Sequence, residues 1–422
     1  MTKLGGRLRW TICGLLFLAT TVNYIDRQLI AILKPVLAKE FHWRESDYGW
    51  IVFSFQCAYA LTMPFAGRLL DRLGTRVGYA VAVTVWGLAS MAHAFARNFA
   101  EFAVARFALG VGEAANFPAA IKTVADWFPA KERALATGIF NSGSNMGAII
   151  APLLVQFVAV RWGWRPTFLV TGALDGVWLI AWLLLFHRPA EHPRLSSEEL
   201  AYIDSDAPAQ AAEKIEYWSL LRLPGAWAFI TGKLLTDPVW WFYLFWIPGF
   251  LNRTYGLELA NVGPPVVCIY LAADAGSILG GALSGHLLSR GWTLNWARKV
   301  SMLVCATAAL PVCSLLFVHN LWPAVAVISL AAAAHQGWSA NLYTLVSDTF
   351  PRSTVGSVVG LGGFAGAIGG MVVAPAIGYW LDFSNGAYGP LFVGAGSAYL
   401  LALGLIQWLL PKLRAGDNAY ST

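Results

Sequence analysis

Long apolar stretches separated by short polar segments run along the whole chain. Each stretch approaches the roughly 20 residues that an α-helix needs to cross the hydrocarbon core of a bilayer. The pattern predicts an all-α membrane protein with twelve transmembrane helices. The predicted spans cover residues 9–33, 46–69, 77–96, 99–123, 133–157, 165–186, 225–250, 262–288, 297–317, 321–345, 352–379 and 387–410.

The composition supports a membrane protein that spans the bilayer many times. Hydrophobic residues make up 57% of the 422 residues and charged residues only 12%, whereas soluble domains average roughly 25% charged residues. The net charge of +6 comes from Lys and Arg spread over short loops without a basic block. This distribution argues against a nucleic-acid partner, and the lipid bilayer is the expected environment.

The distribution of Lys and Arg predicts the orientation. With the N-terminus inside, the loops on the cytoplasmic side carry most of the basic loop residues, as the positive-inside rule describes. We therefore expect both termini in the cytoplasm. The first span begins with basic residues but lacks a small-residue cleavage site and carries charges, so we interpret it as a retained helix and not a signal peptide.

One long polar segment divides the chain. Residues 187–224 are rich in Pro, Ser, Glu and Asp, which indicates a cytoplasmic linker. A short helix is expected to begin near Ser196 and Ser197, because Glu198 and Glu199 suit a first helical turn. The predicted domains are a six-helix bundle at 1–186, the linker at 187–224 and a second six-helix bundle at 225–422.

The two bundles repeat each other in sequence. DWFPAKERALATG (126–138) has a counterpart in DTFPRSTVGSVVG (348–360), and GAIIAP (147–152) has one in GGMVVAP (369–375). Self-similarity of this kind predicts two homologous bundles.

The cysteines give no sign of a metal site. All of them fall within predicted spans, and no pair has metal-ligand spacing. We expect small core residues, with no metal and no cofactor. They are Cys13, Cys57, Cys268, Cys305 and Cys313.

The segment GRLLDRLGTR (67–76), between the second and third spans, resembles the loop motif of the major facilitator superfamily. Gly67 would let helices approach closely, and Asp71 at a helix end can take cationic partners. The resemblance implies a conformational latch; the alternative is an ordinary basic cytoplasmic loop. In the second bundle, Ser289 stands in the position of the acid. The candidate latch residues are Gly67, Asp71, Arg72, Gly74, Arg76 and Arg133.

Five further segments narrow the resemblance. They look like the hexuronate transporters of the anion:cation symporter branch, and they lie in spans of both bundles. The resemblance implies proton-coupled import of sugar acids such as glucuronate or galacturonate across the bacterial inner membrane, and neighbouring relatives carry aldonates such as galactonate. The segments are NYIDRQ (23–28), GEAANFPAAIKTVADWFPAKERA (112–134), TDPVWWFYLFWIP (236–248), LAADAGSILGG (271–281) and AHQGWSANLYTLVSD (334–348).

The fourth span carries two opposite charges. Arg106 and Glu113 are seven residues apart and share one helix face, while Gly110 and Gly112 keep that face open for another helix. One interpretation is a buried structural ion pair. In the other, Glu113 carries a proton: burial favours the protonated carboxyl and a nearby Arg favours the ionised one, so movement of the Arg switches the protonation state.

The first span places four polar residues around one sector of a helix. Asn23 and Tyr24 lie one turn before Asp26 and Arg27. Arg27 offers a planar fork that binds a carboxylate through two donors, so we expect it to contact the substrate. The structural alternative is permanent pairing with Asp26 or Glu113. Asp26 is a second candidate for proton coupling, because charges at this depth are costly and are kept for function.

The second bundle supplies another charged set. In the seventh span, Lys233 and Asp237 are four residues apart, with Trp240 one turn further. Asp274 in the eighth span is a candidate partner of Lys233. Pro238 and Pro248 mark places where the seventh span is expected to break or bend.

The tenth span adds polar side chains at helical spacing. His335 is either a satisfied core histidine or part of the wall of a polar cavity, and its neighbours favour the cavity wall. The candidate substrate contacts of this span are His335, Gln336, Ser339 and Asn341. Tyr59 and Asn145 in the first bundle are candidate partners of sugar hydroxyls.

Together these features predict a monomeric carrier that binds a sugar acid near the membrane midplane between the two bundles and works by alternating access. The cargo is expected to be a hexuronate, or else an aldonate, moved inward with protons. Two rivals remain: a carrier of aromatic or dicarboxylic acids, and a non-transporting sensor. The chain shows no enzyme signature.

Overall fold

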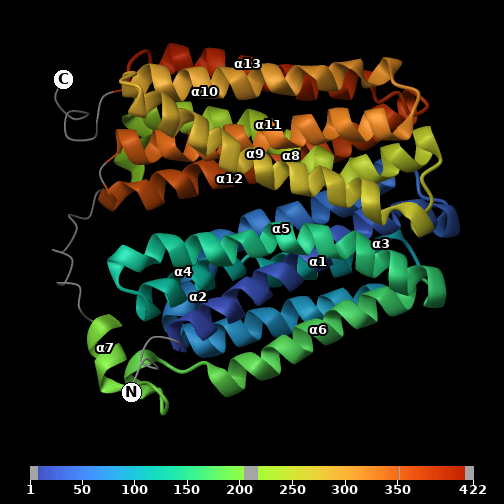
Figure 1. Cartoon of the computed structure of the whole chain (residues 1–422). Helices are drawn as coiled ribbons and strands as arrows, with labels where there is room; N and C mark the ends of the chain where they lie inside the picture. The colour runs from blue at the N-terminus through green and yellow to red at the C-terminus, as the bar shows by residue number, and fades with distance from the viewer. Residues whose placement is uncertain (1–7, 204–216, 351, 414–422) are drawn as a thin grey trace. The chain divides into compact units, whose positions relative to one another are not determined.

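The structure, a computed structural model, describes residues 8–203, 217–350 and 352–413, and every regular element in these ranges is helical. The chain forms two compact units: residues 1–43 and 50–211, and residues 44–49 and 212–422. In Figure 1 the blue-to-green helices belong mainly to the first unit and the yellow-to-red helices to the second. The all-α prediction is confirmed.

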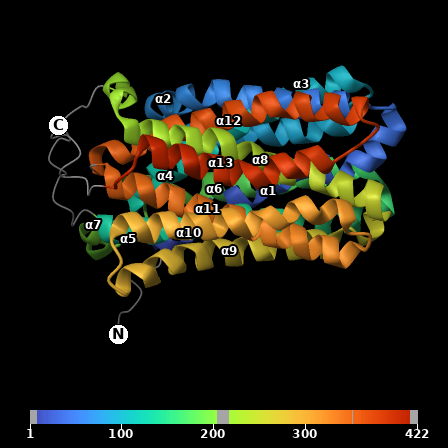
Figure 2. The same cartoon turned by 90° about the horizontal axis from the view of Figure 1, so that it is seen from above.

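The first unit contains the helices before the linker together with one short linker helix. Figure 2 shows its long helices running side by side in roughly the same direction. The elements are α1 (Leu8–Phe41), α2 (Glu45–Ala92), η1 (His93–Phe95), α3 (Phe99–Glu113), α4 (Asn116–Trp127), α5 (Ala130–Trp162), α6 (Trp164–Leu185), η2 (Pro189–Glu191) and α7 (Ser197–Ile203).

The second unit contains the helices after the linker. Each of the twelve predicted spans falls on one helix or on part of one, or on two consecutive helices. The elements are η3 (Tyr217–Arg222), α8 (Pro224–Tyr255), η4 (Leu259–Asn261), α9 (Gly263–Ser289), α10 (Leu294–Ala309), η5 (Leu310–Phe317), α11 (Leu321–Thr349), α12 (Arg352–Phe383) and α13 (Gly389–Leu409).

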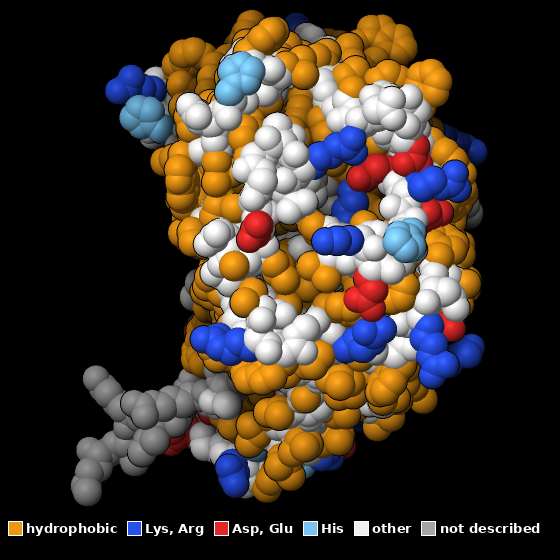
Figure 3. Space-filling view, turned by 90° about the vertical axis from the view of Figure 1, so that its right-hand side faces the viewer, with side chains coloured by type: hydrophobic (Ala, Val, Ile, Leu, Met, Phe, Trp, Pro, Cys, Tyr) orange, Lys and Arg blue, Asp and Glu red, His pale blue; other side chains and the backbone are white. Residues whose placement is uncertain are grey.

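Many of these helices are suited to a bilayer. Among the described residues, eight helices are long and apolar enough to cross a membrane, judged by length and composition. Figure 3 shows many hydrophobic side chains on the drawn face, with Lys, Arg, Asp and Glu among them. That face is the right-hand end of the helices in Figure 1, where loops connect them.

The second and third predicted spans form one element with a sharp bend. α2 continues through both, and Gly74 interrupts it with φ 75° and ψ 155°. A positive φ of this size is open to glycine at little cost. The predicted loop is therefore a glycine bend within α2.

The fourth predicted span is divided into two helices. α3 ends at Glu113 and α4 begins at Asn116, so Ala114 and Ala115 form the junction. The hydrophobic pattern predicts one uninterrupted span here. Glu113 is thus the last residue of a helix, not a residue within one.

The predicted internal repeat is visible in the packing. α1 packs on α5 in the first unit, and α8 packs on α12 in the second. Gly147 of α5 lies against the backbone of Thr21, and Gly369 of α12 lies against the backbone of Leu234. A side chain at either glycine would push these helices apart, which explains why both copies carry glycine.

The predicted break in α8 does not occur, and one cysteine lies outside the core. α8 runs as one helix through Pro238 and Pro248, so neither proline ends it. Cys268 is exposed, although Cys13 and Cys305 are buried as expected. Tight packing on the glycine-rich face of α12 supports α8 along its length.

The predicted linker helix is confirmed and is docked on the first unit. α7 begins at Ser197, and the Ser196 hydroxyl caps it by accepting a hydrogen bond from the backbone N–H of Glu199 at 3.1 Å. Arg9 of α1 forms ion pairs with Glu199 at 3.1 Å and with Glu132 of α5 at 2.9 Å. Ile203 joins the apolar core of the unit. The beginning of the linker is therefore part of the first bundle.

Candidate functional site

The polar residues of α1 lie inside the first unit. Asn23, Asp26 and Arg27 are each at most 2% exposed, and Tyr24 is half-buried. Apolar neighbours such as Ile25 and Leu29 are also buried. The polar sector that the spacing predicts is therefore enclosed by protein.

Arg27 forms a buried ion pair with Glu113. Its Nη2 lies 2.7 Å and its Nε 3.0 Å from the same oxygen, Oε2 of Glu113. The Glu113 side chain is fully buried, and its other oxygen, Oε1, has no hydrogen-bond donor among the described residues. Nη2 of Arg27 also donates to Oδ1 of Asn23 at 3.4 Å.

Three aromatic rings surround the Arg27 guanidinium. Its central carbon lies 4.6 Å from the ring centre of Tyr24, 5.1 Å from Phe55 and 5.2 Å from Tyr59. Aromatic faces attract a guanidinium and shield it from other ligands on those sides. The rings leave the edge that holds Glu113 as the place where a carboxylate can bind.

Arg106 forms hydrogen bonds with the backbone of α1. Its Nη2 donates to the carbonyl oxygen of Arg27 at 3.0 Å, and its Nη1 donates to that of Asp26 at 3.4 Å. The sequence placed Arg106 and Glu113 on one face, but the ion pair at Glu113 is formed by Arg27 from another helix. Gly110 and Gly112 bring α3 against the backbone of α2, as expected.

Two further substrate contacts were predicted in the first unit, Tyr59 and Asn145. They lie in different places relative to Arg27. Tyr59 lies beside the Arg27 guanidinium and is 9% exposed. Asn145 lies on α5 and is half-buried, with its Oδ1 3.5 Å from the hydroxyl of Ser144. Tyr59 therefore belongs to the Arg27 cluster, whereas no described contact connects Asn145 to it.

Lys233 and Asp237 form the predicted pair in the second unit. The Lys233 Nζ lies 2.8 Å from Oδ2 of Asp237 and donates to the Tyr343 hydroxyl at 3.2 Å. Asp237 also lies against Gly366 of α12, where a larger residue would collide with its carboxylate. Lys233, the expected partner of Asp274, is thus bound by Asp237 and Tyr343.

His335 is enclosed by aromatic residues. Its ring stacks on Trp240 with centroids 4.9 Å apart, and its Nδ1 is 2.9 Å from the Tyr399 hydroxyl. His335 is 4% exposed. This geometry is that of a satisfied histidine within a packed wall.

Asn341 connects two helices. Its Nδ2 donates to the carbonyl oxygens of Gly280 on α9 and Gly337 on α11, both at 2.9 Å. Gln336 and Ser339 on the same helix are half-buried. The amide nitrogen of Asn341 is therefore used in the contact between α9 and α11. Gln336 and Ser339 do not share this role.

The latch segment is described in part. The side chains of Asp71 and Arg133, and the surroundings of Gly67, lie outside the described part of the structure. Gly74 forms the bend of α2. Arg76 donates to the carbonyl oxygen of Leu183 at the end of α6.

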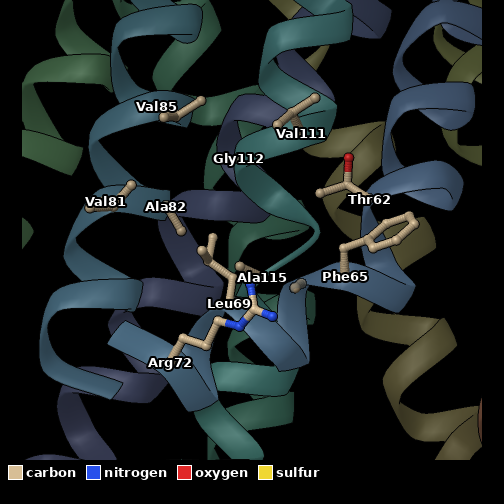
Figure 4. A pocket seen from close by; sticks show the side chains of 11 residues that line it. Thr62, Phe65, Leu69, Arg72, Val81, Ala82, Val85, Val111, Gly112 and Ala115 are labelled. Atoms are coloured by element: carbon tan, nitrogen blue, oxygen red, sulfur yellow. The ribbon is translucent and has the colours of Figure 1, made fainter. Parts of the chain in front are cut away.

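Arg72 lies at one end of an apolar groove in the first unit. The groove encloses about 380 Å³ between the two arms of α2 and the junction of α3 and α4. Figure 4 shows the Arg72 side chain extending beside Leu69 and Ala115, with Phe65 and Val85 further along the groove. Apart from Arg72 and Thr62, its lining offers little for a polar ligand.

A polar network beside Asp26 was not predicted from the sequence. Ser90 of α2 donates to Oδ1 of Asp26 at 2.6 Å, and its hydroxyl is 3.2 Å from that of Thr171 on α6. Trp86 donates to Asp175 of α6 at 2.8 Å. Asp175 had a signal in the sequence, since it is an acid inside an otherwise apolar span.

The described residues contain no group of three or more His, Cys, Asp or Glu side chains that could hold a metal ion. The polar clusters instead combine cations, carboxyls and aromatic rings. Such sets bind organic anions and protons.

The sequence of the chain is similar to those of known membrane transporters. The family model described as Major Facilitator Superfamily matches residues 16–372. The chain is 35% identical to a hexuronate transporter of Escherichia coli (strain K12) over 429 aligned positions, covering 100% of this chain and 98% of the other. It is 38% identical to a galacturonate transporter of Dickeya chrysanthemi over 285 positions, covering 67% of this chain and 82% of that protein.

A solved structure shares the fold. The xylose transporter XylE from E. coli, in an inward open conformation, matches with a TM-score of 0.74 at 14% identity, covering 96% of each chain. At this identity the likeness concerns the fold alone.

Proposed function

Because the chain belongs to the Major Facilitator Superfamily and is a multi-pass membrane transporter, not an enzyme, we propose that it imports a hexuronate anion together with protons. The substrate class rests on the similarity to a hexuronate transporter and a galacturonate transporter. We place it in the bacterial inner membrane as a monomer, with both termini in the cytoplasm. Alternating access moves the bound anion across the bilayer.

The buried pair of Arg27 and Glu113 carries this proposal. A uronate has one carboxylate, which is the same group that Glu113 presents to Arg27 at 2.7 Å. The substrate carboxylate replaces Glu113 at the guanidinium, because the fork binds carboxylates in a defined plane. The aromatic rings around Arg27 keep the cation in position during this exchange.

The exchange couples the substrate to a proton. Once Arg27 has turned to the substrate, Glu113 is a buried carboxylate without its cation, and such a group takes up a proton. Arg106 stays bound to the backbone of α1 and supports the segment that carries Arg27. Substrate binding and protonation of Glu113 therefore favour one another. Asp26 serves as a second proton-coupling residue.

The second unit contributes further contacts in this proposal. Lys233, held by Asp237 and Tyr343, supplies a second cation for the anionic sugar. Trp240 offers an aromatic face for the sugar ring, and Gln336 and Ser339 offer polar groups for hydroxyls. Asn23, Tyr24, Tyr59 and Asn145 are the corresponding groups of the first unit.

The latch residues govern the balance between open states. Arg76 ties the second arm of α2 to the end of α6, and Gly74 sets the bend between the arms. We propose that Asp71, with Gly67, Arg72 and Arg133, stabilises one of these states without contacting the substrate. A modest energetic bias is enough to shift such populations.

The voltage dependence follows from the charges moved. Each elementary charge that crosses 100 mV is worth about 2.3 kcal/mol. One proton balances a uronate monoanion electrically, and a second proton makes import electrogenic. The response of uptake to membrane potential therefore reports the number of coupled protons.

Uptake by the purified protein in proteoliposomes tests the proposal. Labelled glucuronate should accumulate when the outside is acidic, and unlabelled galacturonate should compete. Galactonate, an aromatic acid and a dicarboxylic acid serve as competitors of other classes. Stronger competition by one of these would reassign the substrate class, and absence of both uptake and counterflow for every acid would refute transport of organic acids.

A further inference from the structure

The apolar groove of the first unit has no role in the transport scheme above. Its lining residues lie on the two arms of α2, on α3 and at the junction of α3 and α4, all within the first unit. Its volume of about 380 Å³ is within the roughly 300–1,000 Å³ that is typical of sites for one small ligand. The groove is therefore large enough to hold a ligand of its own.

Large apolar side chains line the groove and are exposed. Phe65 and Leu69 on the first arm of α2 are 63% and 46% exposed, and Val81 on the second arm is 43% exposed. A contiguous exposed apolar surface marks a place where a membrane component, a ligand or another protein binds. In a membrane-spanning chain, the hydrocarbon of a lipid is the apolar partner that is always present.

The groove has the length of about one leaflet of a bilayer. Arg72 lies at one end of it (Figure 4) and begins the part of α2 that is long and apolar enough to cross a membrane. Thr62 also lines the groove and precedes Arg72 by ten residues of α2, which corresponds to a helix rise of about 15 Å. This is half of the roughly 30 Å hydrocarbon core. A lipid with its headgroup at Arg72 would therefore lay its acyl chain along the groove.

The end of the groove at Arg72 is rich in cations. Residues 68–76 contain three arginines and one aspartate. The guanidinium of Arg188 lies at the bend of α2, where a side chain at Gly74 would come within 3.1 Å of its Nη2. Within the described ranges, no carboxylate pairs with Arg72, Arg76 or Arg188. The positive charge at this end is therefore open to an anion from outside the chain.

We propose that the groove binds one anionic phospholipid, with its phosphate at Arg72 and an acyl chain against Phe65, Leu69 and Val81. An arginine suits a phosphate because its planar fork donates two parallel hydrogen bonds to the oxygens. Basic pockets between membrane-spanning helices on the cytoplasmic side bind anionic headgroups through the same chemistry. A neutral lipid fills the apolar part equally well but leaves the positive charge without a counter-ion. The site therefore selects the headgroup through Arg72.

Photo-crosslinking of the full-length protein in vesicles tests the site. The vesicles are made of phosphatidylcholine with a fixed trace of phosphatidylglycerol that carries a photoreactive acyl chain, and the labelled positions are found by mass spectrometry. Labels should appear at Phe65, Leu69 or Val81. Replacing part of the phosphatidylcholine by unlabelled phosphatidylglycerol should reduce labelling of the groove. Labelling of Val177, an exposed position of α6 outside the groove, should not change.

Arg72→Gln tests the contact with the headgroup. Labelling of the groove should fall by about fivefold, because one basic residue near the membrane contributes about that factor to the binding of an anionic lipid. Arg161→Gln is the matched control, since Arg161 is an exposed arginine on α5 outside the groove. This variant should label the groove as the wild type does.

Val81→Phe tests the apolar part and replaces Arg72→Gln if that variant fails to fold. The larger ring, placed at an exposed position, occupies the space of the acyl chain, so labelling of Phe65 and Leu69 should fall. Val177→Phe, the same substitution outside the groove, should leave this labelling unchanged. Equal labelling of the groove in Val81→Phe and Val177→Phe would contradict an acyl chain at this place.

Three other results would overturn the proposal. Groove labelling that does not respond to unlabelled phosphatidylglycerol, or that is equal in Arg72→Gln and the wild type, would mean that the groove holds unselected bilayer lipid. Loss of labelling on addition of inorganic phosphate would assign the cationic end to a free anion. Labels on Val177 without any in the groove would mean that protein covers the groove. No measurement here uses a sugar acid, so the outcome is independent of the proposed function.

Discussion

Nη2 of Arg27 lies 2.7 Å from Oε2 of Glu113, and both residues are at most 2% exposed. Their helices, α1 and α3, meet at this pair. Both Nε and Nη2 of Arg27 address one oxygen of Glu113. The arrangement holds the cation while leaving the second carboxyl oxygen, Oε1, without a donor in the described part of the chain. A pair of this kind can open, because one incoming carboxylate can satisfy Arg27 better than Glu113 does.

Arg27→Lys tests the planar fork. The substitution keeps the positive charge but loses one of the two donors that Arg27 directs at a carboxylate. Uronate affinity should fall by about 1.5–3 kcal/mol, the range for hydrogen bonds to charged groups, or roughly tenfold to more than a hundredfold. Isothermal titration calorimetry on purified protein measures this change.

Arg165→Lys is the control for the Arg27→Lys substitution. Arg165 forms a partly exposed ion pair with Glu40 at 3.1 Å, and exposed pairs contribute little. Its uronate affinity should match that of the wild type. Near-normal affinity in Arg27→Lys would exclude the two-donor role.

Asn341→Ala separates a structural role from a substrate contact. The Asn341 amide bonds two carbonyl oxygens where α9 meets α11, so its removal should destabilise the protein by about 1–3 kcal/mol. The apparent melting temperature should fall while the affinity for uronate stays the same. Ser339→Ala, on the half-buried side of the same helix, is the comparison. A loss of affinity without a loss of stability in Asn341→Ala would restore the substrate contact.

Glu199→Ala tests the docking of the linker helix. The substitution removes the ion pair with Arg9 at 3.1 Å, in which the Glu199 side chain is 4% exposed. We expect α7 to open more often, with its amide exchange roughly tenfold faster or more. Hydrogen exchange followed by mass spectrometry reports this directly. Glu198→Ala, at the exposed neighbouring position, should leave the exchange unchanged; equal rates in both variants would argue against the tether.

The helical plan could be predicted because each span is defined by local hydrophobicity. The two elements that were misplaced depend on one or two residues each. Gly74 joins two spans through a positive φ, and Ala114 and Ala115 separate α3 from α4 although alanine favours helix. Nothing in the local pattern distinguishes such alanines from helical ones.

The sequence indicated which residues belong to the site, but not which of them contact one another. Arg27 and Glu113 were each identified from a charge inside an apolar span, yet their pairing depends on how α1 packs on α3. Helical spacing instead suggested Arg106 as the partner of Glu113. Only pairs within one helix, such as Lys233 and Asp237, follow from spacing alone. The hydrogen bond from Ser90 to Asp26 could not be foreseen, because it joins the first and third spans.

Glu113→Gln decides between coupling and structure at the Arg27 pair. The amide imitates the protonated carboxyl, so a variant of a coupling residue should still bind glucuronate and exchange it by counterflow, since both need only the loaded carrier to move. Accumulation driven by a pH gradient should be lost, because no proton can be released at this position. A structural Glu113 predicts a different result: Arg27 is 2% exposed, and removing its partner would leave a buried cation, at a cost of about 3–5 kcal/mol. Folding, binding and exchange would then fail together.

Counterflow and pH-driven uptake measured on the same reconstituted Glu113→Gln sample therefore distinguish the two roles. The exposed Glu101 at the start of α3 provides the control, because Glu101→Gln should preserve both activities. Retained accumulation in Glu113→Gln would remove Glu113 from the coupling scheme. Asp26 would then be the coupling residue. Its carboxyl accepts a hydrogen bond from Ser90 of α2, so its proton would be exchanged without any change in the partner of Arg27.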